Sequence, residues 1–280
     1  MANELTYTNA ATTSLNLNDG TKYRLVQPPS GIYQPMGEPV LQDVPVGLPP
    51  SIYMGHLFKP RTISVSLIVH GTSASDLITN VRALAAHFWP DLRAGYRGIL
   101  AYTSWNGMAR AIRAVLDPST DFDGWVAKAS TGKGTVRIDL VFQCPDPTWY
   151  NATAVTPSGA FNGAAAVNIS CANAGDCDSW PTITYTATGG TATVNPKVTD
   201  AYGRVWDIAR TIAATKVAVL TFDPNAISIV YDGSTDWYGY ETAASQLIKV
   251  KYGTNNLTFT ATSGDAAIAI SFYSRYSTAG

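Results

Sequence analysis

Charged residues are scarce in this chain. Of its 280 residues only 14% are Asp, Glu, Lys or Arg, and the formal net charge is -1. Soluble domains usually carry about a quarter charged residues, so a free monomer with this surface would be poorly soluble. The sequence therefore predicts that partner subunits cover much of the surface. A chain so close to neutrality also lacks the electric field that attracts nucleic acids or anionic membranes.

The side chains that usually carry catalysis or bind metals are also few. The chain has three glutamates, and its three histidines, His56, His70 and His87, have no His, Cys or Glu partner at a metal-ligand spacing. It contains no Gly-x-Ser-x-Gly nucleophile elbow and no local Cys/His signature. We therefore expect no catalytic residue, no cofactor site and no metal site, and we predict that the chain is not an enzyme.

Cysteine is rare and odd in number. Cys144, Cys171 and Cys177 fit no zinc spacing, so the simplest interpretation is three buried or inert thiols. A disulfide between Cys171 and Cys177 is the alternative, provided that the protein works outside a reducing cytoplasm.

Two short motifs resemble binding loops only weakly. The run from Asp117 to Gly124 could hold a cation through carboxylates and backbone carbonyls, but it lacks the spacing and the bidentate glutamate of a calcium loop. Its residues are those that any turn between strands prefers. Gly132-Lys133-Gly134 is too short for a phosphate-binding loop, and no helical pattern follows it. We interpret the first motif as a turn and the second as the tip of a hairpin.

No segment is suited to crossing a membrane. The first residues lack the basic segment and apolar run of a secretory signal. The longest uncharged stretch, Pro147–Gly175, is interrupted by polar residues, proline and glycine, whereas a spanning helix needs about 20 mainly apolar residues. Because the length suggests two domains, we interpret residues 151–175 as a linker between an N-terminal domain (1–150) and a C-terminal domain (176–280).

Proline is concentrated in one segment. Residues 27–60 hold eight of the 16 prolines, a density that disfavours both a helix and a central strand. The same segment contains many apolar and aromatic side chains, which argues against a mobile loop. It is predicted to be an ordered arm that packs on its own domain or on a neighbouring subunit.

The rest of the N-terminal domain has one helical pattern among strand patterns. Apolar residues recur at helical spacing from Leu77 to Phe88, after a segment of capping side chains and before Pro90. This predicts a single helix over about residues 73–89. Alternation of apolar and polar residues predicts strands around it, with hairpin turns at 104–107 and 131–134. The predicted strands are 63–69, 98–103, 109–116, 125–129 and 135–144.

The second half of the chain consists of strand patterns. About seven short strands, separated by turns rich in Gly, Asn and Asp, predict a β-sandwich. One turn, residues 232–241, carries Trp237, Tyr238 and Tyr240. These rings could stack on sugars, although exposed aromatic residues mark protein interfaces at least as often.

The order of these features resembles a known family. The proline-rich arm is followed by Arg61-Thr62-Ile63-Ser64-Val65-Ser66-Leu67, and the first domain ends on Pro145-Asp146-Pro147-Thr148-Trp149-Tyr150. The second domain opens with Asn173-Ala174-Gly175-Asp176 and Trp180-Pro181-Thr182-Ile183. In this order and spacing, over essentially the whole chain, the sequence resembles the distal tail proteins (Dit) of long-tailed, non-contractile bacteriophages, the siphoviruses.

The resemblance implies a mainly β protein, with a β-rich α+β N-terminal belt domain that carries one helix and a C-terminal galectin-like or carbohydrate-module-like β-sandwich. It implies a structural virion protein that forms a ring, commonly a hexamer, at the distal end of the tail tube. The implied partners are further copies of the chain, the tail tube protein, the tape measure protein, the baseplate hub or tail-associated protein, and receptor-binding or fibre proteins. The implied location is the virion tail tip, assembled in the host cytoplasm, with neither a membrane nor sequence-specific nucleic acid as a partner.

Two other functions compete with this one. The alternative is a carbohydrate-binding two-domain β-sandwich lectin, which requires aromatic residues such as Trp237 exposed beside polar groups in a groove. A cell-wall hydrolase of the same tail tip has no support from paired carboxylates, zinc ligands or a Cys/His signature. The three cysteines depart from the family pattern, and the chain has no room for the inserted sugar-binding modules of enlarged members. A galectin-like fold does not by itself imply sugar binding.

Overall fold

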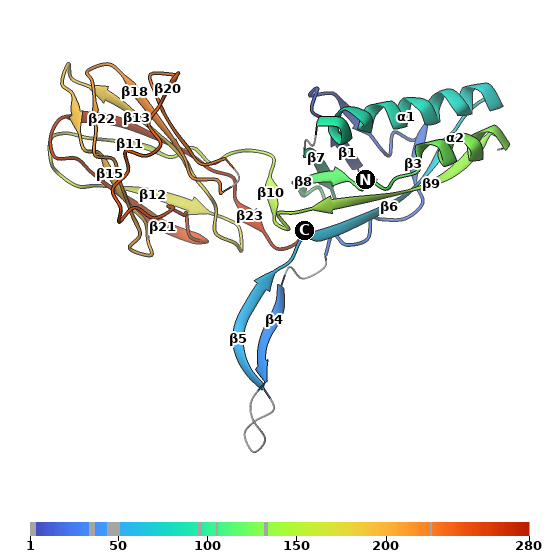
Figure 1. The fold of residues 1–280 in the computed structure, drawn as a ribbon, viewed down its shortest axis with the longest axis horizontal. Helices are drawn as coiled ribbons and strands as arrows, with labels where there is room; N and C mark the ends of the chain where they lie inside the picture. The colour runs from blue at the N-terminus through green and yellow to red at the C-terminus, as the bar shows by residue number, and fades with distance from the viewer. Residues whose placement is uncertain are drawn as a thin grey trace. The chain divides into compact units, whose positions relative to one another are not determined.

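The computed structural model of the chain describes residues 4–33, 37–43, 51–94, 97–104, 106–131, 134–224 and 226–279, with the backbone alone for 37–43, 51–58 and 94. The chain divides into two compact units, one of Met1–Trp149 with Ser277–Gly280 and the other of Tyr150–Tyr276. Both consist mainly of β-strands, which confirms the predicted fold class (Figure 1). No described helix is long and apolar enough to span a membrane.

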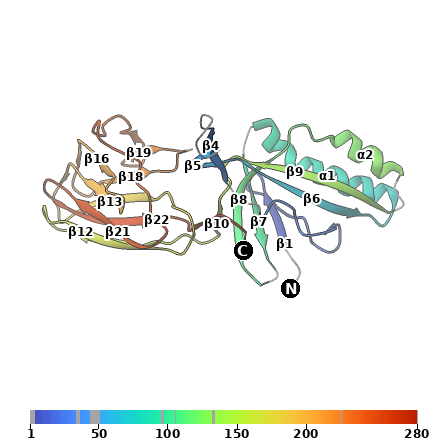
Figure 2. The same ribbon diagram turned by 90° about the horizontal axis from the view of Figure 1, so that it is seen from below.

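The first unit is built on one antiparallel sheet, with two helices on one of its faces (Figures 1 and 2). The strand order along the main path is β2-β1-β7-β8-β9-β6-β3. The strands are β1 (Glu4–Thr8), β2 (Ser14–Asn16), β3 (Tyr23–Leu25), β6 (Arg61–His70), β7 (Gly98–Thr103), β8 (Ala109–Leu116) and β9 (Thr135–Cys144). The bounds of β7 and β8 are those that the sequence predicted.

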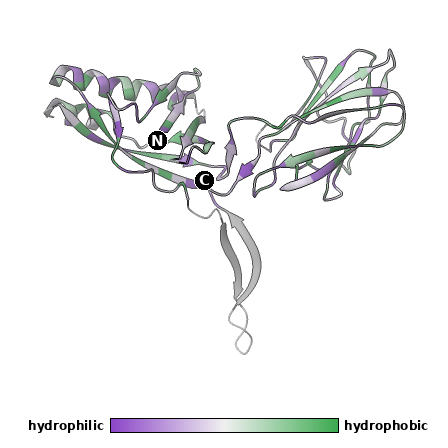
Figure 3. Cartoon of the chain, turned by 180° about the vertical axis from the view of Figure 1, so that it is seen from behind, coloured by the Kyte–Doolittle hydropathy of each residue, from purple (hydrophilic) through white to green (hydrophobic). Residues whose placement is uncertain are grey.

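β6 and β9 make the longest pairing of this sheet, ten residues in register from Arg61↔Cys144 to His70↔Thr135. Along β6 the apolar side chains from Ile63 to Val69 are buried, and the residues between them are partly or fully exposed. In Figure 3, which is coloured by hydropathy, hydrophobic and hydrophilic residues are likewise interspersed along the strands of this unit. The alternation in sequence from which this strand was predicted thus matches the alternation in burial that packs one face of β6 on the core.

α1 (Ala74–Ala94) begins at the predicted cap, where the Ser73 hydroxyl accepts a hydrogen bond from the Asp76 N–H at 3.1 Å. Its predicted end before Pro90 is wrong, because the helix continues through that residue to Ala94. A proline inside a helix removes a donor and clashes with the carbonyl four residues earlier, at a cost of about 3 kcal/mol. Contacts outside the helix must therefore hold its last turn.

A buried carboxylate supplies those contacts. Asp91 accepts a hydrogen bond from the Tyr7 hydroxyl at 2.8 Å and another from the Ala10 N–H at 2.6 Å. The Asn9 side-chain amide donates to the His87 carbonyl, inside the same part of the helix, at 3.0 Å. These partners lie in and just after β1, more than 70 residues away in sequence, so a local pattern could not show them.

The prediction of a strand at 125–129, and with it that of a single helix, is wrong. Residues Phe122–Thr131 form a second helix, α2, which packs beside α1. The Asp121 carboxylate caps it by accepting the Gly124 N–H at 2.8 Å. Trp125 and Ala129, four residues apart, are both buried. In so short a segment the same residues also fit a strand pattern, so the period could not be decided from sequence.

The arm at 27–60 contains two strands, neither of them the central strand that its proline content was predicted to disfavour. β4 (Gly37–Asp43) and β5 (Ser51–Phe58) pair antiparallel, with an irregularity between Val40 and Leu41. Among the described residues, this hairpin pairs with no other strand. Both of its strands are therefore edges, which is where a sheet tolerates proline. Residues 34–36 and 44–50 lie outside the described residues.

The second unit is the predicted β-sandwich. Its buried apolar residues form one core to which two main sheets contribute, with a small β14–β17 pair beside them. The six-stranded sheet has the order β11 (Ser158–Phe161), β22 (Asp265–Ser271), β13 (Thr182–Thr188), β18 (Val217–Thr221), β19 (Ser228–Tyr231), β20 (Thr235–Asp236). The four-stranded sheet has the order β12 (Val167–Asn173), β21 (Gly253–Thr260), β15 (Lys197–Thr199), β16 (Val205–Asp207). The small pair is β14 (Thr193–Val194) with β17 (Thr211–Ile212).

The interpretation of residues 151–175 as a linker is wrong. This segment belongs to the second unit and supplies one strand to each main sheet, β11 and β12. β12 pairs with β21 over seven residues and buries Ile169, Cys171 and Asn173. The prediction failed because the segment is rich in Ala, Gly and Asn, which have low strand propensity, whereas cross-strand packing decides the outcome.

The C-terminal residues return to the first unit. β10 (Trp149–Asn151) and β23 (Arg275–Tyr276) pair with each other where the chain passes between the units. The buried Arg61 guanidinium then donates to the carbonyls of Ile32 at 2.7 Å, Gly31 at 3.2 Å and Ser277 at 2.5 Å. Arg61 thus ties the C-terminal tail to the segment that precedes the hairpin.

Limited proteolysis should spare residues 158–161 and 167–173. Because the backbone of these residues is paired on β22 and β21, a protease has no free extended segment to bind there. Digestion followed by mass spectrometry of the fragments checks this expectation. A preferred cut within either strand under native conditions would contradict the structure.

Replacing Asp91 with alanine should lower the free energy of unfolding by about 2 kcal/mol, because the Ala10 N–H would lose its acceptor and the buried Tyr7 hydroxyl would keep only the longer bond to the Ala114 carbonyl. Chemical denaturation of the full chain measures the change. Asp139→Ala is the matched control, since Asp139 lies in an exposed ion pair with Arg137. An equal loss in both variants would show that the Asp91 bonds do not hold the helix end.

Candidate interaction surfaces

The aspartates singled out by sequence are structural. The Asp117 carboxylate accepts hydrogen bonds from the Ser119 hydroxyl at 2.6 Å and the Ser119 N–H at 2.9 Å, and these bonds hold its pKa below the usual value. Asp121 caps α2, as described above. Within the described part of the chain, no group of three or more His, Cys, Asp or Glu residues is placed to hold a metal ion.

The three histidines lie on different elements and do not converge. His70 ends β6, and His56 lies on β5, where the side chain is outside the described residues. His87 lies on α1, and its Nε2 atom is 3.1 Å from the Tyr7 carbonyl oxygen. Burial lowers the pKa of His87 more than the neighbouring groups raise it, so the ring favours its neutral form.

The cysteines are the inert thiols that the sequence predicted. All three are free, Cys144 and Cys171 are buried, and Cys177 is half-buried. Burial raises the pKa of Cys144 to about 12 and that of Cys171 to about 11. For Cys177, burial and the contact with Asp176 raise the pKa to about 12. Thiols with such values are protonated at neutral pH and react slowly.

The Gly132-Lys133-Gly134 motif is not the tip of a hairpin. It connects α2 to β9, and Gly134 has the positive φ of 85° that this connection needs. Gly132 and Lys133 lie outside the described residues.

The aromatic loop at 232–241 is only partly exposed. Trp237 is 8% exposed and stacks on Tyr231, with ring centroids 4.1 Å apart and planes 7° apart. Tyr238 is exposed, and Tyr240 is 42% exposed with the Arg210 guanidinium 3.7 Å from its ring centroid. The residue on which the lectin alternative chiefly depended is therefore part of the core of the sandwich.

A surface of tyrosines and cations on the second unit was not predicted. We call it the Tyr–Lys patch. Its members come from three separate segments, so only the fold brings them together: Asp178, Trp180, Tyr202, Arg204, Lys249, Lys251 and Tyr252.

The contacts of the Tyr–Lys patch bind its three segments into one surface. Lys249 lies 4.7 Å from the Trp180 ring centroid and Lys251 lies 5.3 Å from that of Tyr202. The Tyr202 hydroxyl donates to the Asp178 carboxylate at 3.0 Å, and burial together with this bond raises the Tyr202 pKa to about 12. Tyr252 is 55% exposed. Exposed Tyr, Trp and Arg side chains are typical of protein interfaces.

The first unit also exposes large apolar side chains. Trp89, on α1, is 58% exposed and meets Phe122 of α2 edge to face, with ring centroids 6.1 Å apart. Val26 and Tyr33, which precede the hairpin, are exposed as well. These positions lie on the helical face and beside the root of the arm, where a neighbouring subunit could cover them.

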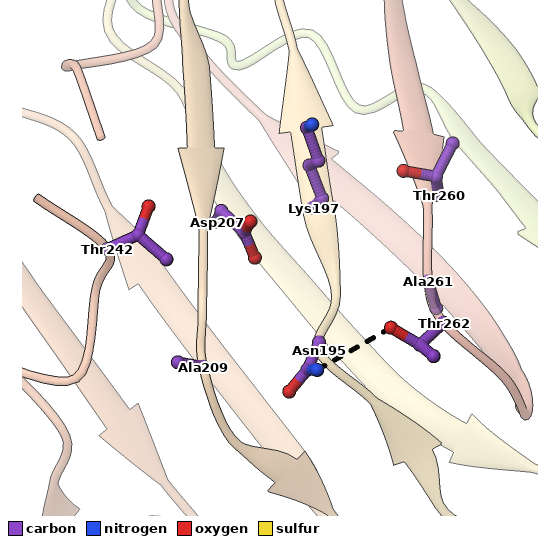
Figure 4. Close-up of a pocket in the computed structure, with 8 residues that line it drawn as sticks. All are labelled: Asn195, Lys197, Asp207, Ala209, Thr242, Thr260, Ala261 and Thr262. Carbon is purple, nitrogen blue, oxygen red and sulfur yellow. Dashed lines mark hydrogen bonds between the residues drawn. The ribbon is translucent and has the colours of Figure 1, made fainter. Parts of the chain in front are cut away.

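A small polar pocket opens on the four-stranded sheet of the second unit, with a volume of about 270 Å³ (Figure 4). Its lining comes from the outer face of β15, β16 and β21 and from the segments next to these strands. The lining residues are Asn195, Lys197, Asp207, Ala209, Thr242, Thr260, Ala261 and Thr262.

Comparison with known proteins identifies the fold. No family model matches the chain, and no curated protein matches it in sequence. Among solved structures, the Dit protein of phage SPP1, a paradigm of the hub adsorption apparatus in phages that infect Gram-positive bacteria, aligns with a TM-score of 0.72. The sequence identity is 16%, and the alignment covers 98% of this chain and 99% of that one.

A second solved structure gives a similar match. The phage P2 baseplate in its activated conformation with Ca aligns with a TM-score of 0.57 at 13% identity, over 97% of this chain and 98% of that one. The same baseplate with Sr gives the same values. Likeness at such low identity shows the fold, and at that level it confirms the resemblance predicted from the sequence. This chain has the fold of a Dit protein, the hub protein of a phage adsorption apparatus.

Proposed function

We propose that this chain is a structural protein of a phage tail, and that six copies form a ring at the distal end of a long, non-contractile tail tube. In the virion, the ring would join the tube and the tape measure protein to the baseplate hub and to the receptor-binding or fibre proteins. The protein would have no enzymatic activity of its own.

The observation that carries this proposal is the extent of the match to the SPP1 Dit protein, which includes both units and nearly the whole of each chain. A likeness confined to the sandwich would fit a lectin equally well. The first unit, with its sheet, two helices and hairpin, has no role in a lectin. A ring-forming belt accounts for it.

The isolated hairpin supports the ring. A two-stranded hairpin is marginally stable in water unless it packs on something else. β4 and β5 pair with no other described strand of their own chain. We therefore place this hairpin on a neighbouring copy in the ring, together with the exposed Val26 and Tyr33 at its root.

The Tyr–Lys patch supports a different contact. It lies on the second unit, which the proposal leaves at the periphery of the ring. Its exposed tyrosines and cations have the composition of a protein interface. We assign it to the docking of a receptor-binding or fibre protein.

The oligomeric state tests the proposed function directly. Light scattering on the purified full chain, followed by negative-stain imaging, should show a closed ring of six copies with a central channel. A chain that stays monomeric at micromolar concentration would contradict the proposal.

Deleting residues 37–58 should abolish the ring while leaving both units folded. The deletion keeps Ile32, which is buried, and Arg61, which anchors it. Light scattering measures the loss of assembly. Near-ultraviolet circular dichroism of the stacked Tyr231–Trp237 pair serves as the control for the fold of the second unit. A deleted variant that still forms rings would show that the hairpin is not an assembly element.

A further inference from the structure

The polar pocket of the second unit differs from an ordinary surface depression in its lining. Six of its eight lining residues carry polar side chains, and the remaining two are the small residues Ala209 and Ala261. Three of the polar residues are threonines, whose hydroxyls both donate and accept hydrogen bonds. Asn195 adds an amide, and its φ of 49° holds it in the left-handed region that asparagine tolerates better than most residues.

Three polar groups of the pocket are left without partners. Within the described part of the chain, the Lys197 ammonium, the Asp207 carboxylate and the Thr260 hydroxyl make neither a hydrogen bond nor an ion pair. Lys197 and Asp207 are directly opposite each other on β15 and β16, a position in which opposite charges usually pair. Figure 4 shows the lysine chain running along β15, with the carboxylate projecting toward that strand. The pocket therefore presents a donor, an acceptor and a hydroxyl to solvent.

The charges around the pocket cancel. Lys197 and Asp207 line it, and Arg210 and Glu241 belong to the two chain segments that border it. With one cation balancing one anion in each pair, the site has no preference for a charged ligand. A volume of about 270 Å³ fits one small ring rather than a peptide. The lining thus suits a compact, neutral molecule with several hydroxyl groups.

An exposed aromatic residue, Tyr240, belongs to a segment next to the pocket. The Ala209 N–H donates to the Tyr240 carbonyl at 3.0 Å, and the Asn195 N–H donates to the Arg210 carbonyl at 3.0 Å. The backbone of Arg210 and that of Tyr240 are therefore each bonded to a residue that lines the pocket. The Arg210 guanidinium covers one face of the Tyr240 ring. Tyr240 nevertheless remains 42% exposed. Such an amphipathic ring can pack against the apolar face of a sugar.

We propose that this pocket binds one neutral sugar residue of a glycan. Asp207 accepts from the sugar hydroxyls, Lys197 and Asn195 donate to them, and Thr260 does both. Tyr240 covers the edge of the sugar ring. This site goes beyond the proposed ring function, because it adds direct contact with a glycan to a protein otherwise assigned to assembly.

Saturation-transfer difference NMR with the full chain tests the site, whatever its oligomeric state. The probes are the methyl glycosides of glucose, galactose and N-acetylglucosamine, with glucuronic acid as the charged comparison. At least one neutral probe should show saturable transfer, with a dissociation constant on the order of 1 mM. Its binding should not change with ionic strength, because a neutral ligand is not screened by salt.

Two variants place the site. Thr260→Val should weaken binding about tenfold, since it removes one hydroxyl that meets the ligand. Thr199→Val is the matched control, because Thr199 lies on the same face of β15, outside the pocket, and loses the same group. Asp207→Asn, which preserves shape, should also weaken binding. Melting curves confirm that all three variants are folded.

Three results would each overturn the proposal. They are the absence of transfer to every neutral probe, an equal loss of binding in Thr199→Val and Thr260→Val, and tighter binding of glucuronic acid than of the neutral glycosides. None of them bears on the ring, whose test is the oligomeric state alone.

Discussion

The buried guanidinium of Arg61 is the interaction on which the arrangement of the first unit depends. A buried charge is costly unless hydrogen bonds compensate it, and the two terminal nitrogens of Arg61 donate to the carbonyls of Ile32 and Ser277. The first carbonyl belongs to the turn at residues 31–33, before the hairpin, and the second to the tail that returns from the sandwich. One side chain at the start of β6 therefore fixes where the hairpin leaves the sheet and where the chain ends.

The sequence predicted those strands well in which apolar and polar residues alternate with a period of two along the whole segment. β6 and β9 alternate apolar and polar side chains over six or more residues, and each forms a strand close to or at its predicted bounds. The start of α1 followed from the Ser73 cap in the same way. The resemblance to a Dit protein depended on the order of such segments, and the fold agrees with it.

The predictions failed where distant residues decide the structure. Pro90 marks the end of a helix in any local analysis, but the Asp91 bonds to Tyr7 and Ala10 carry the helix past it. β12 looks like a linker until β21 pairs with it. The same limit applies to the candidate surfaces. Trp237 seemed an exposed platform, whereas Tyr231 buries it, and the Tyr–Lys patch and the polar pocket each draw on three or more separate segments.

The structure shows which side chains are exposed in each unit in place of the charges that the sequence lacks. In the first unit, the exposed side chains that stand out are apolar, with Trp89 on the helical face and Tyr33 at the root of a hairpin that pairs with no other described strand. In the second unit, several charges are compensated locally, as in the cation–π contacts of Lys251 and the ion pair of Lys216 with Asp232. Apolar exposure favours permanent contact between copies, since desolvation drives it. Balanced polar groups favour reversible contact with neutral or mixed surfaces, because no net charge must be desolvated. Exposed tyrosines of the second unit, such as Tyr202 and Tyr252, add apolar surface there as well. Each unit therefore presents side chains that a contact with another protein would remove from water, and the low overall charge lowers the cost of that contact.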